Sequence, residues 1–148
     1  MQSAHILLIE DDDVLGDLIM RNLQARGHDV KTTGDAESAL ASLRSRKFDL
    51  VLLDINLPDR TGWDILREVQ QEGILRPHDF NGHKQVFPVV VLSAVRVSPH
   101  RLAEFRPLAY LPKPFPMEAL LRLAAEVAAW HQEASGSERE QAANNGEL

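Results

Sequence analysis

Four short apolar runs in this sequence are each followed by side chains that could do chemistry. In chain order these side chains are Glu10, Asp11, Asp54, Ser93 and Lys113. Three carboxylates held close together repel one another and raise each other's pKa values unless a counter-charge is present. Mg²⁺ can supply that charge, because it takes one or two carboxylates, keeps several waters and leaves a position for a phosphate oxygen.

The other two side chains extend this chemistry toward phosphoryl transfer. Lys113 is a compact cation suited to a phosphoryl or carboxylate oxygen, and the Ser93 hydroxyl can donate to the same oxygen. A carboxylate in such surroundings can act as a nucleophile toward phosphorus and form an aspartyl-phosphate. The metal and the lysine would neutralise charge on the transferring group.

The elements that must position these residues can be read from the apolar pattern. Expected strands cover residues 4–9, 28–32, 50–53, 89–92 and 109–111. Helical spacing of apolar residues predicts helices over 14–25, which Gly27 ends, over 36–43 and 65–69, weakly over 99–105, and from Met117 to about Trp130. Strands that alternate with helices predict a doubly wound α/β fold, a three-layer sandwich with a five-stranded parallel sheet. Because sites in such folds form at the carboxyl ends of the strands, the five polar side chains should meet there.

Two segments lie outside this pattern. Residues 73–87 are polar and irregular, and they contain Pro77 and Gly82, so we expect a long surface loop. Residues 131–148 are dominated by Ser, Gly, Asn, Gln and Glu, which predicts a disordered polar tail or the stub of a linker after a domain over residues 1–130.

Composition excludes several classes of function. The chain has 148 residues, of which 44% are apolar, enough for one domain. Its net charge of −6 disfavours direct nucleic-acid binding, and the absence of cysteine excludes disulfides, thiol catalysis and cysteine-ligated zinc. The sequence shows neither a signal peptide nor an apolar stretch long enough to span a membrane, so we expect a cytoplasmic protein.

At this point the sequence resembles a known family, the receiver domains of bacterial two-component response regulators. Ile6–Asp12 is similar to the family's opening segment, and Asp49–Asp59 with Gly62 to its phosphoacceptor segment. Val89–Ala94 resembles the switch strand, and Tyr110–Phe115 the lysine motif. The resemblance covers about residues 4–130 and is to single-domain, chemotaxis-type regulators. It implies the flavodoxin-like strand order 2-1-3-4-5 with five helices.

The resemblance also implies roles for the acidic residues and for their partners in signalling. Asp54 would be the phosphoacceptor and a ligand of Mg²⁺. Asp11 would ligate the metal directly with help from Glu10, and the backbone carbonyl of Asn56 would be a further ligand. The phosphoryl donor would be a histidine kinase or a histidine phosphotransfer protein.

For the remaining residues the resemblance implies a switch. Ser93 would turn toward the phosphoryl group, and Tyr110 would then move inward. Lys113 would pair with Asp54 before phosphorylation and with the phosphoryl group afterwards, and the Lys113–Pro114 bond is often cis in the family. The helix at 99–105, the strand at 109–111 and the last helix would carry the signal to a protein target. A homodimer that forms on phosphorylation is a further possible partner arrangement.

Other functions remain as alternatives. An aspartate-dependent phosphohydrolase would need a second acid two residues after its nucleophile, where this chain has Asn56. A scaffold or dimerisation module of receiver shape would need none of the site residues. Asp12 and Asp13 are expected to cap a helix or to be solvated, and Trp63 to pack at a helix start. Tyr110 has core filling as its alternative role.

Overall fold

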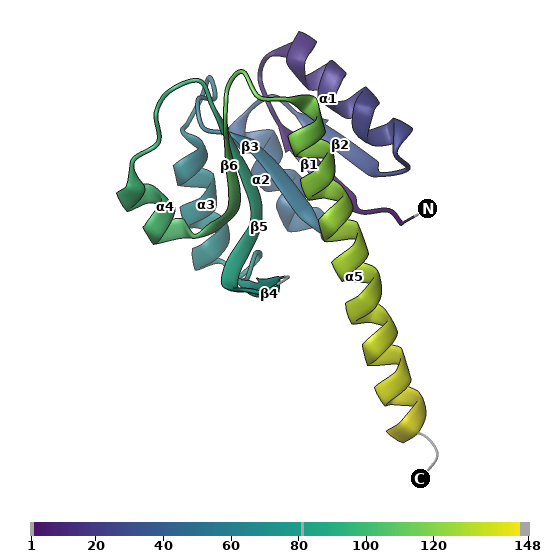
Figure 1. Ribbon diagram of the computed structural model, residues 1–148. Helices are drawn as coiled ribbons and strands as arrows, with labels where there is room; N and C mark the ends of the chain where they lie inside the picture. The colour runs from purple at the N-terminus through teal and green to yellow at the C-terminus, as the bar shows by residue number, and fades with distance from the viewer. Residues whose placement is uncertain (1, 81, 146–148) are drawn as a thin grey trace.

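The computed structural model describes residues 2–80 and 82–145, and in that part a six-stranded sheet lies between two layers of helices (Figure 1). The strands are β1 (His5–Ile9), β2 (Asp29–Thr33), β3 (Leu50–Asp54), β4 (His78–Phe80), β5 (His83–Ser93) and β6 (Pro107–Pro112). The helices are α1 (Asp13–Ala25), α2 (Ala36–Ser45), α3 (Gly62–Gln71), α4 (Pro99–Phe105) and α5 (Met117–Asn145). The prediction of a doubly wound α/β fold is confirmed.

The parallel strands follow the order β2-β1-β3-β5-β6, which is the expected order 2-1-3-4-5 with the last two strands renumbered. β4 is additional and pairs antiparallel with the first part of β5. The prediction of five strands was therefore one strand short. β2 begins one residue later than expected, and β6 extends beyond the expected 109–111 at both ends.

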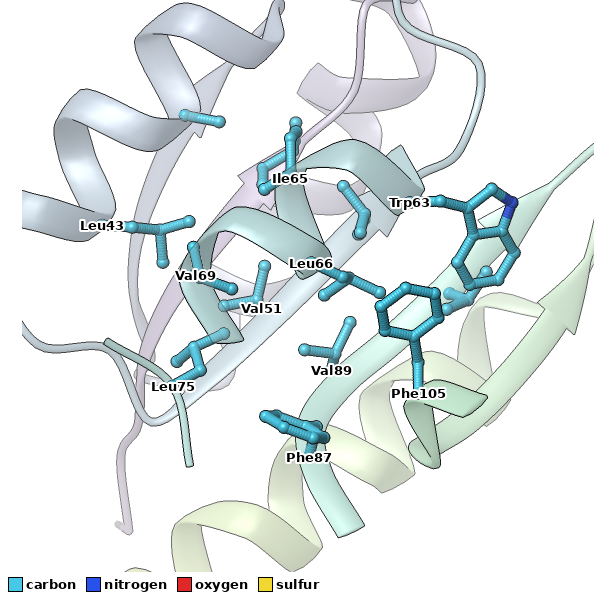
Figure 2. Close-up of a cluster of buried hydrophobic side chains, with 14 of the residues drawn as sticks. Leu43, Val51, Trp63, Ile65, Leu66, Val69, Leu75, Phe87, Val89 and Phe105 are labelled. Carbon is cyan, nitrogen blue, oxygen red and sulfur yellow. The ribbon is translucent and has the colours of Figure 1, made fainter. Parts of the chain in front are cut away.

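Each face of the sheet has its own apolar core. On one face, Ile19 and Leu23 of α1 and Leu120 of α5 pack against β1 and β3 residues. On the other face, α2, α3 and α4 cover the sheet. Figure 2 shows part of this second core, in which Leu66 of α3 lies over Val51 and Val89 of the adjacent strands β3 and β5. All five residues of β3 are buried, as the uninterrupted apolar run at 50–53 predicted.

Local signals in the sequence define the ends of α1. The Asp12 side chain accepts hydrogen bonds from the backbone N–H groups of Val14 and Leu15, which confirms its expected capping role. At the other end Gly27 has a φ of 90°, and its N–H donates to the carbonyl of Gln24. This left-handed residue ends the helix as the sequence predicted.

The expected loop at 73–87 is wrong over most of its length. β4 and the first residues of β5 form an antiparallel hairpin in which Phe80 pairs with His83. A turn signal was present, because the intervening residues in the sequence are Asn-Gly, a pair favoured in two-residue hairpin turns. The polar residues around it hid the strands, because the hairpin is exposed apart from Phe80 and the β5 residues from Val86 onward.

The last helix also differs from the expectation. The backbone stays helical to Asn145 instead of ending near Trp130, and Figure 1 shows α5 running well past the sheet. The tail was expected to be disordered because its polar side chains cannot form a core, but polarity alone does not prevent helical hydrogen bonding. Residues 146–148 of the expected tail lie outside the described residues, and the domain boundary at residue 130 stays a prediction. In the described part of the chain, no helix combines the length and the apolar character needed to cross a membrane.

Candidate functional site

Three carboxylates meet at the carboxyl end of the sheet. Glu10 and Asp11 follow β1, and Asp54 is the last residue of β3. Because β1 and β3 are paired in parallel with Ile9 beside Leu53, the residues at their ends lie side by side. One carboxylate oxygen from each of the three acids lies within 4.8 Å of the others. Glu10 and Asp54 are buried, whereas Asp11 is exposed.

Lys113 reaches this cluster from the segment after β6. Its Nζ lies 2.9 and 3.1 Å from the two carboxylate oxygens of Glu10 and 3.4 Å from Asp54 Oδ2. The Lys113 backbone N–H donates to the Ser93 carbonyl at 2.8 Å, which holds the lysine segment against the end of β5. The Lys113–Pro114 peptide bond is cis, as the resemblance implied.

The electrostatics of the cluster follow from burial and from the two opposing charges. Burial raises the pKa of Glu10 to about 7, and the nearby Asp54 carboxylate adds to this rise, while the hydrogen bonds from Lys113 oppose it. Desolvation and then the adjacent Asp54 raise the pKa of Asp11. Burial alone would lower the pKa of Lys113, but its ion pairs with Glu10 and Asp54 outweigh that effect and raise it. The cluster therefore has more negative charge than Lys113 can balance.

The loop after β3 holds Asp54 in place. The Asn56 backbone N–H donates to Asp54 Oδ1 at 3.1 Å, and the Gly62 N–H donates to the Ile55 carbonyl at 2.8 Å. A Cβ on Gly62 would lie 2.9 Å from the Asp54 carbonyl oxygen, so only glycine fits where α3 begins against β3. Asn56 is placed beside the cluster, and the ligand role of its carbonyl stays a prediction.

Ser93 and Tyr110 meet at a backbone group that the sequence did not indicate. The buried Ser93 hydroxyl donates to the Val95 carbonyl at 2.8 Å, and the Tyr110 hydroxyl donates to the same oxygen at 3.4 Å. The Ser93 hydroxyl is therefore hydrogen-bonded within its own loop. Sequence reasoning missed the Val95 carbonyl because every residue has one, so no side-chain pattern marks it.

The donor set of the cluster fits Mg²⁺. Hard oxygen ligands from carboxylates are those this cation prefers, and they carry the excess negative charge that a divalent cation offsets. Glu10, Asp11 and Asp54 are the residues that would hold it, and they include all three acids expected from the sequence.

Other residues considered from the sequence lie elsewhere or have structural roles. Trp63 is buried at the start of α3 and stacks on Phe105 of α4, with ring centroids 5.5 Å apart, so the packing role is confirmed. Asp13 is the first residue of α1. His78 and His83 lie in the β4–β5 hairpin, at the opposite end of the sheet from the carboxylates.

A doubly wound α/β domain with acids and a lysine gathered at the carboxyl edge of its sheet is the arrangement expected of a receiver domain. The sequence comparison makes the assignment definite. Residues 6–125 match the response regulator receiver domain family, and the chain belongs to that family. It is a receiver domain of two-component response regulators.

Relatives among characterised proteins agree with this assignment. The chain is 38% identical over 117 residues to the response regulator protein PmrA of Pseudomonas aeruginosa, covering 78% of this chain and 48% of PmrA. It is 32% identical over 127 residues to the probable transcriptional regulatory protein TcrX of Mycobacterium tuberculosis, covering 84% of this chain and 50% of TcrX. The chain therefore spans about half the length of these two relatives.

Solved structures show the same fold. The non-phosphorylated HemR receiver domain of Leptospira biflexa matches with a TM-score of 0.68 and 28% identity, over 84% of this chain and 93% of that one. The receiver domain of the sensor histidine kinase PA1611 of Pseudomonas aeruginosa PAO1 matches with a TM-score of 0.66 and 26% identity, over 86% of this chain and 97% of that one. The PA1611 structure has a magnesium ion coordinated in the active-site cleft.

Proposed function

We propose that this chain is a phosphorylation-dependent signalling switch that accepts a phosphoryl group on Asp54. The observation that carries the proposal is the convergence of Glu10, Asp11 and Asp54 with the Lys113 ammonium at one end of the sheet. Asp54 is the acid of the cluster that ends the fully buried strand β3, and the loop after it fixes one of its oxygens through Asn56.

In the proposed reaction an Asp54 oxygen forms a bond to phosphorus while the bond between phosphorus and the donor's imidazole nitrogen breaks. The imidazole leaves with the electron pair and takes a proton from solvent. Lys113, already within reach of Asp54, holds its positive charge against the transferring group. Mg²⁺, when bound by the acids, supplies further positive charge that offsets the charge of the phosphoryl oxygens.

The donor is proposed to be a histidine kinase or a histidine phosphotransfer protein. Apolar surface suited to docking such a protein lies on α1, which begins at the acidic cluster. Val14 and Leu18 are one helical turn apart there and are 81% and 51% exposed. Exposed aliphatic side chains next to a reactive site favour protein contact.

The signal is proposed to leave through α4, β6 and α5 to a protein target in the cytoplasm. β6 is an edge strand whose residues Pro107–Leu111 are all only partly buried, and it carries Tyr110 beside Ser93 through the shared Val95 carbonyl. A phosphoryl group that draws the Ser93 hydroxyl away would break this arrangement and release Tyr110.

Intact-mass spectrometry after incubation with Mg²⁺ and acetyl phosphate tests the proposal. We expect one added phosphoryl group on the wild type and none on Asp54→Asn, and no addition when EDTA replaces Mg²⁺. Asp79→Asn, an exposed aspartate in the hairpin, is the matched control and should gain the group normally. A wild-type protein that gains no phosphoryl group and does not bind beryllofluoride would favour the scaffold alternative.

A further inference from the structure

A large pocket lies at the end of the sheet opposite the acidic cluster. Its volume is about 890 Å³, within the range of roughly 300–1,000 Å³ found for small-molecule sites. We call it the basal pocket. Its walls are the end of α2 with the segment that follows it, the segment after α3, the β4–β5 hairpin, Leu108 of β6 and the middle of α5. Figure 1 shows the hairpin at this end of the sheet with α5 passing beside it. None of the residues that line it belongs to the acidic cluster, although α5 is also part of the proposed output surface.

The interior of the pocket is apolar and aromatic. Phe48, Phe80, Phe87, Leu75 and Trp130 all contribute to its lining. Trp130 packs on the hairpin, with its ring centroid 5.5 Å from that of Phe80 and 5.9 Å from that of His78. Figure 2 shows Leu75 and Phe87 near one another at the edge of the second core. The β4–β5 hairpin, which stands in place of the expected loop, therefore forms one wall of the pocket.

The charged groups in the lining are mostly cationic, although the whole chain has a net charge of −6. The lining contains three cationic side chains, those of Arg46, Lys47 and Arg76, and one carboxylate, that of Asp49. That carboxylate is already engaged, since it accepts the His5 backbone N–H at 2.7 Å and lies 3.3 Å from His131 Nδ1. The pocket thus keeps a positive charge that its own acid does not balance.

Of the three cations, Arg46 already has partners within the protein. It forms an ion pair with Asp29 at 3.0 Å and lies 4.8 Å above the centre of the Phe48 ring. Lys47 and Arg76 are exposed, and neither forms an ion pair with any of the side chains described, those of residues 2–80 and 82–131. Two available cations beside an aromatic cavity are complementary to a molecule that has an apolar body and an anionic group.

We propose that the basal pocket binds a small amphipathic organic anion, with its apolar body against Trp130 and Phe80 and its anionic group between Lys47 and Arg76. The aromatic interior supplies the apolar contact, and the lysine and arginine supply the charge. This site is separate from the phosphoacceptor cluster. It stands whether or not Asp54 accepts a phosphoryl group.

The probe for this proposal is 8-anilinonaphthalene-1-sulfonate, which joins an aromatic body to one sulfonate. We expect saturable binding at one site, with energy transfer from tryptophan to the probe that Trp130→Phe reduces far more than Trp63→Phe does, because Trp130 lines the pocket. N-phenyl-1-naphthylamine, which lacks the sulfonate, should bind at least about tenfold more weakly because it leaves the cations unpaired.

The double variant Lys47→Glu, Arg76→Glu should weaken probe binding at least about tenfold, because it reverses both available charges. Lys31→Glu, Arg122→Glu makes the same charge change at exposed positions outside the pocket and should bind as the wild type does. Circular dichroism and thermal unfolding check that both double variants remain folded, since this probe also binds loosely packed states.

The proposal would be overturned by an absence of saturable binding, by equal affinity for the neutral probe, or by equal affinity of the two double variants. A wild-type dimer in sedimentation analysis that the Lys47→Glu, Arg76→Glu variant loses would also overturn it, because the pocket would then be an interface between two copies of the chain.

Discussion

Lys113 is bound more closely to Glu10 than to Asp54. Its Nζ donates to both Glu10 carboxylate oxygens, at 3.1 and 2.9 Å, and lies 3.4 Å from Asp54 Oδ2. The resemblance to receiver domains had implied a pair between Lys113 and Asp54. Both acids in fact share the lysine, so its removal leaves two buried carboxylates facing one another.

Lys113→Met should lower the free energy of unfolding in EDTA by about 1–3 kcal/mol, because it leaves buried carboxylates without their donor. The loss stays below that of many broken buried ion pairs because Glu10, with a pKa of about 7, can take up a proton. Urea unfolding measures it, and Mg²⁺ should recover part of the loss by replacing the missing positive charge. The control is Lys84→Met at an exposed site in the hairpin, which should change little. A loss no greater than in the control would contradict the shared ion pair.

The raised pKa of Glu10 predicts a pH dependence of stability in the metal-free protein. Between about pH 4.5 and 7 the folded protein holds a proton on Glu10 that the unfolded chain releases, so the free energy of unfolding falls as pH rises through this range. The fall amounts to at most about 3 kcal/mol. It is measured as the difference between the wild type and Glu10→Gln in urea unfolding at several pH values in EDTA. Parallel pH profiles for the two proteins would show that Glu10 does not titrate in this way.

The sequence predicted the members of the candidate site because one rule places them. Side chains that follow parallel strands meet at one edge of the sheet, so Asp54 after 50–53 and Lys113 after 109–111 had to approach one another. The sharing of Lys113 depends on which way a flexible side chain turns, and apolar periodicity carries no information on that. The role of the Val95 carbonyl, which accepts hydrogen bonds from both Ser93 and Tyr110, could not be predicted either, because no side-chain pattern marks a backbone group.

The fold was predictable where a strand or helix is buried, and less so where it is exposed. β3 is buried throughout and left an unbroken apolar run, whereas β4 has only Phe80 buried in three residues. The continuation of α5 to Asn145 likewise lacks the apolar spacing that marked its first turns. In β4 and in the continuation of α5, backbone hydrogen bonds form a regular element although the side chains show no apolar periodicity.

Two glycines near the cluster should respond oppositely to alanine. A Cβ at Gly62 would lie 2.9 Å from the Asp54 carbonyl oxygen and 3.0 Å from Ile55 Cα, so Gly62→Ala should cost about 1–3 kcal/mol of stability. A Cβ at Gly16, inside α1, would meet Glu10 Cγ at 3.9 Å and Glu10 Cβ at 4.0 Å, which are ordinary contacts. Gly16→Ala should therefore stabilise the protein, by up to about 1 kcal/mol. Thermal and urea unfolding of the two variants provide the comparison. A destabilised Gly16→Ala would contradict the inference that a Cβ has room at Gly16.

His28 should make the protein less stable in mild acid. Its side chain is buried, and its Nδ1 accepts the Ala4 backbone N–H at 3.1 Å, so the ring must be neutral in the folded state. Burial, with a smaller effect of Arg26, lowers the pKa of His28 below its usual 6.5. Since the unfolded chain binds the proton more tightly, the stability contributed above pH 6.5 is lost as pH falls through the folded-state pKa.

This acid-side loss has the opposite sign to the effect of Glu10, so the two must be separated by variants. His28→Asn keeps an acceptor for the Ala4 N–H without a titrating ring and should flatten the decline of the free energy of unfolding below pH 6.5. His83→Asn, at an exposed site in the hairpin, should leave the wild-type profile unchanged. NMR titration of the His28 ring gives its pKa directly, and a value at or above 6.5 would rule out this origin of the acid sensitivity.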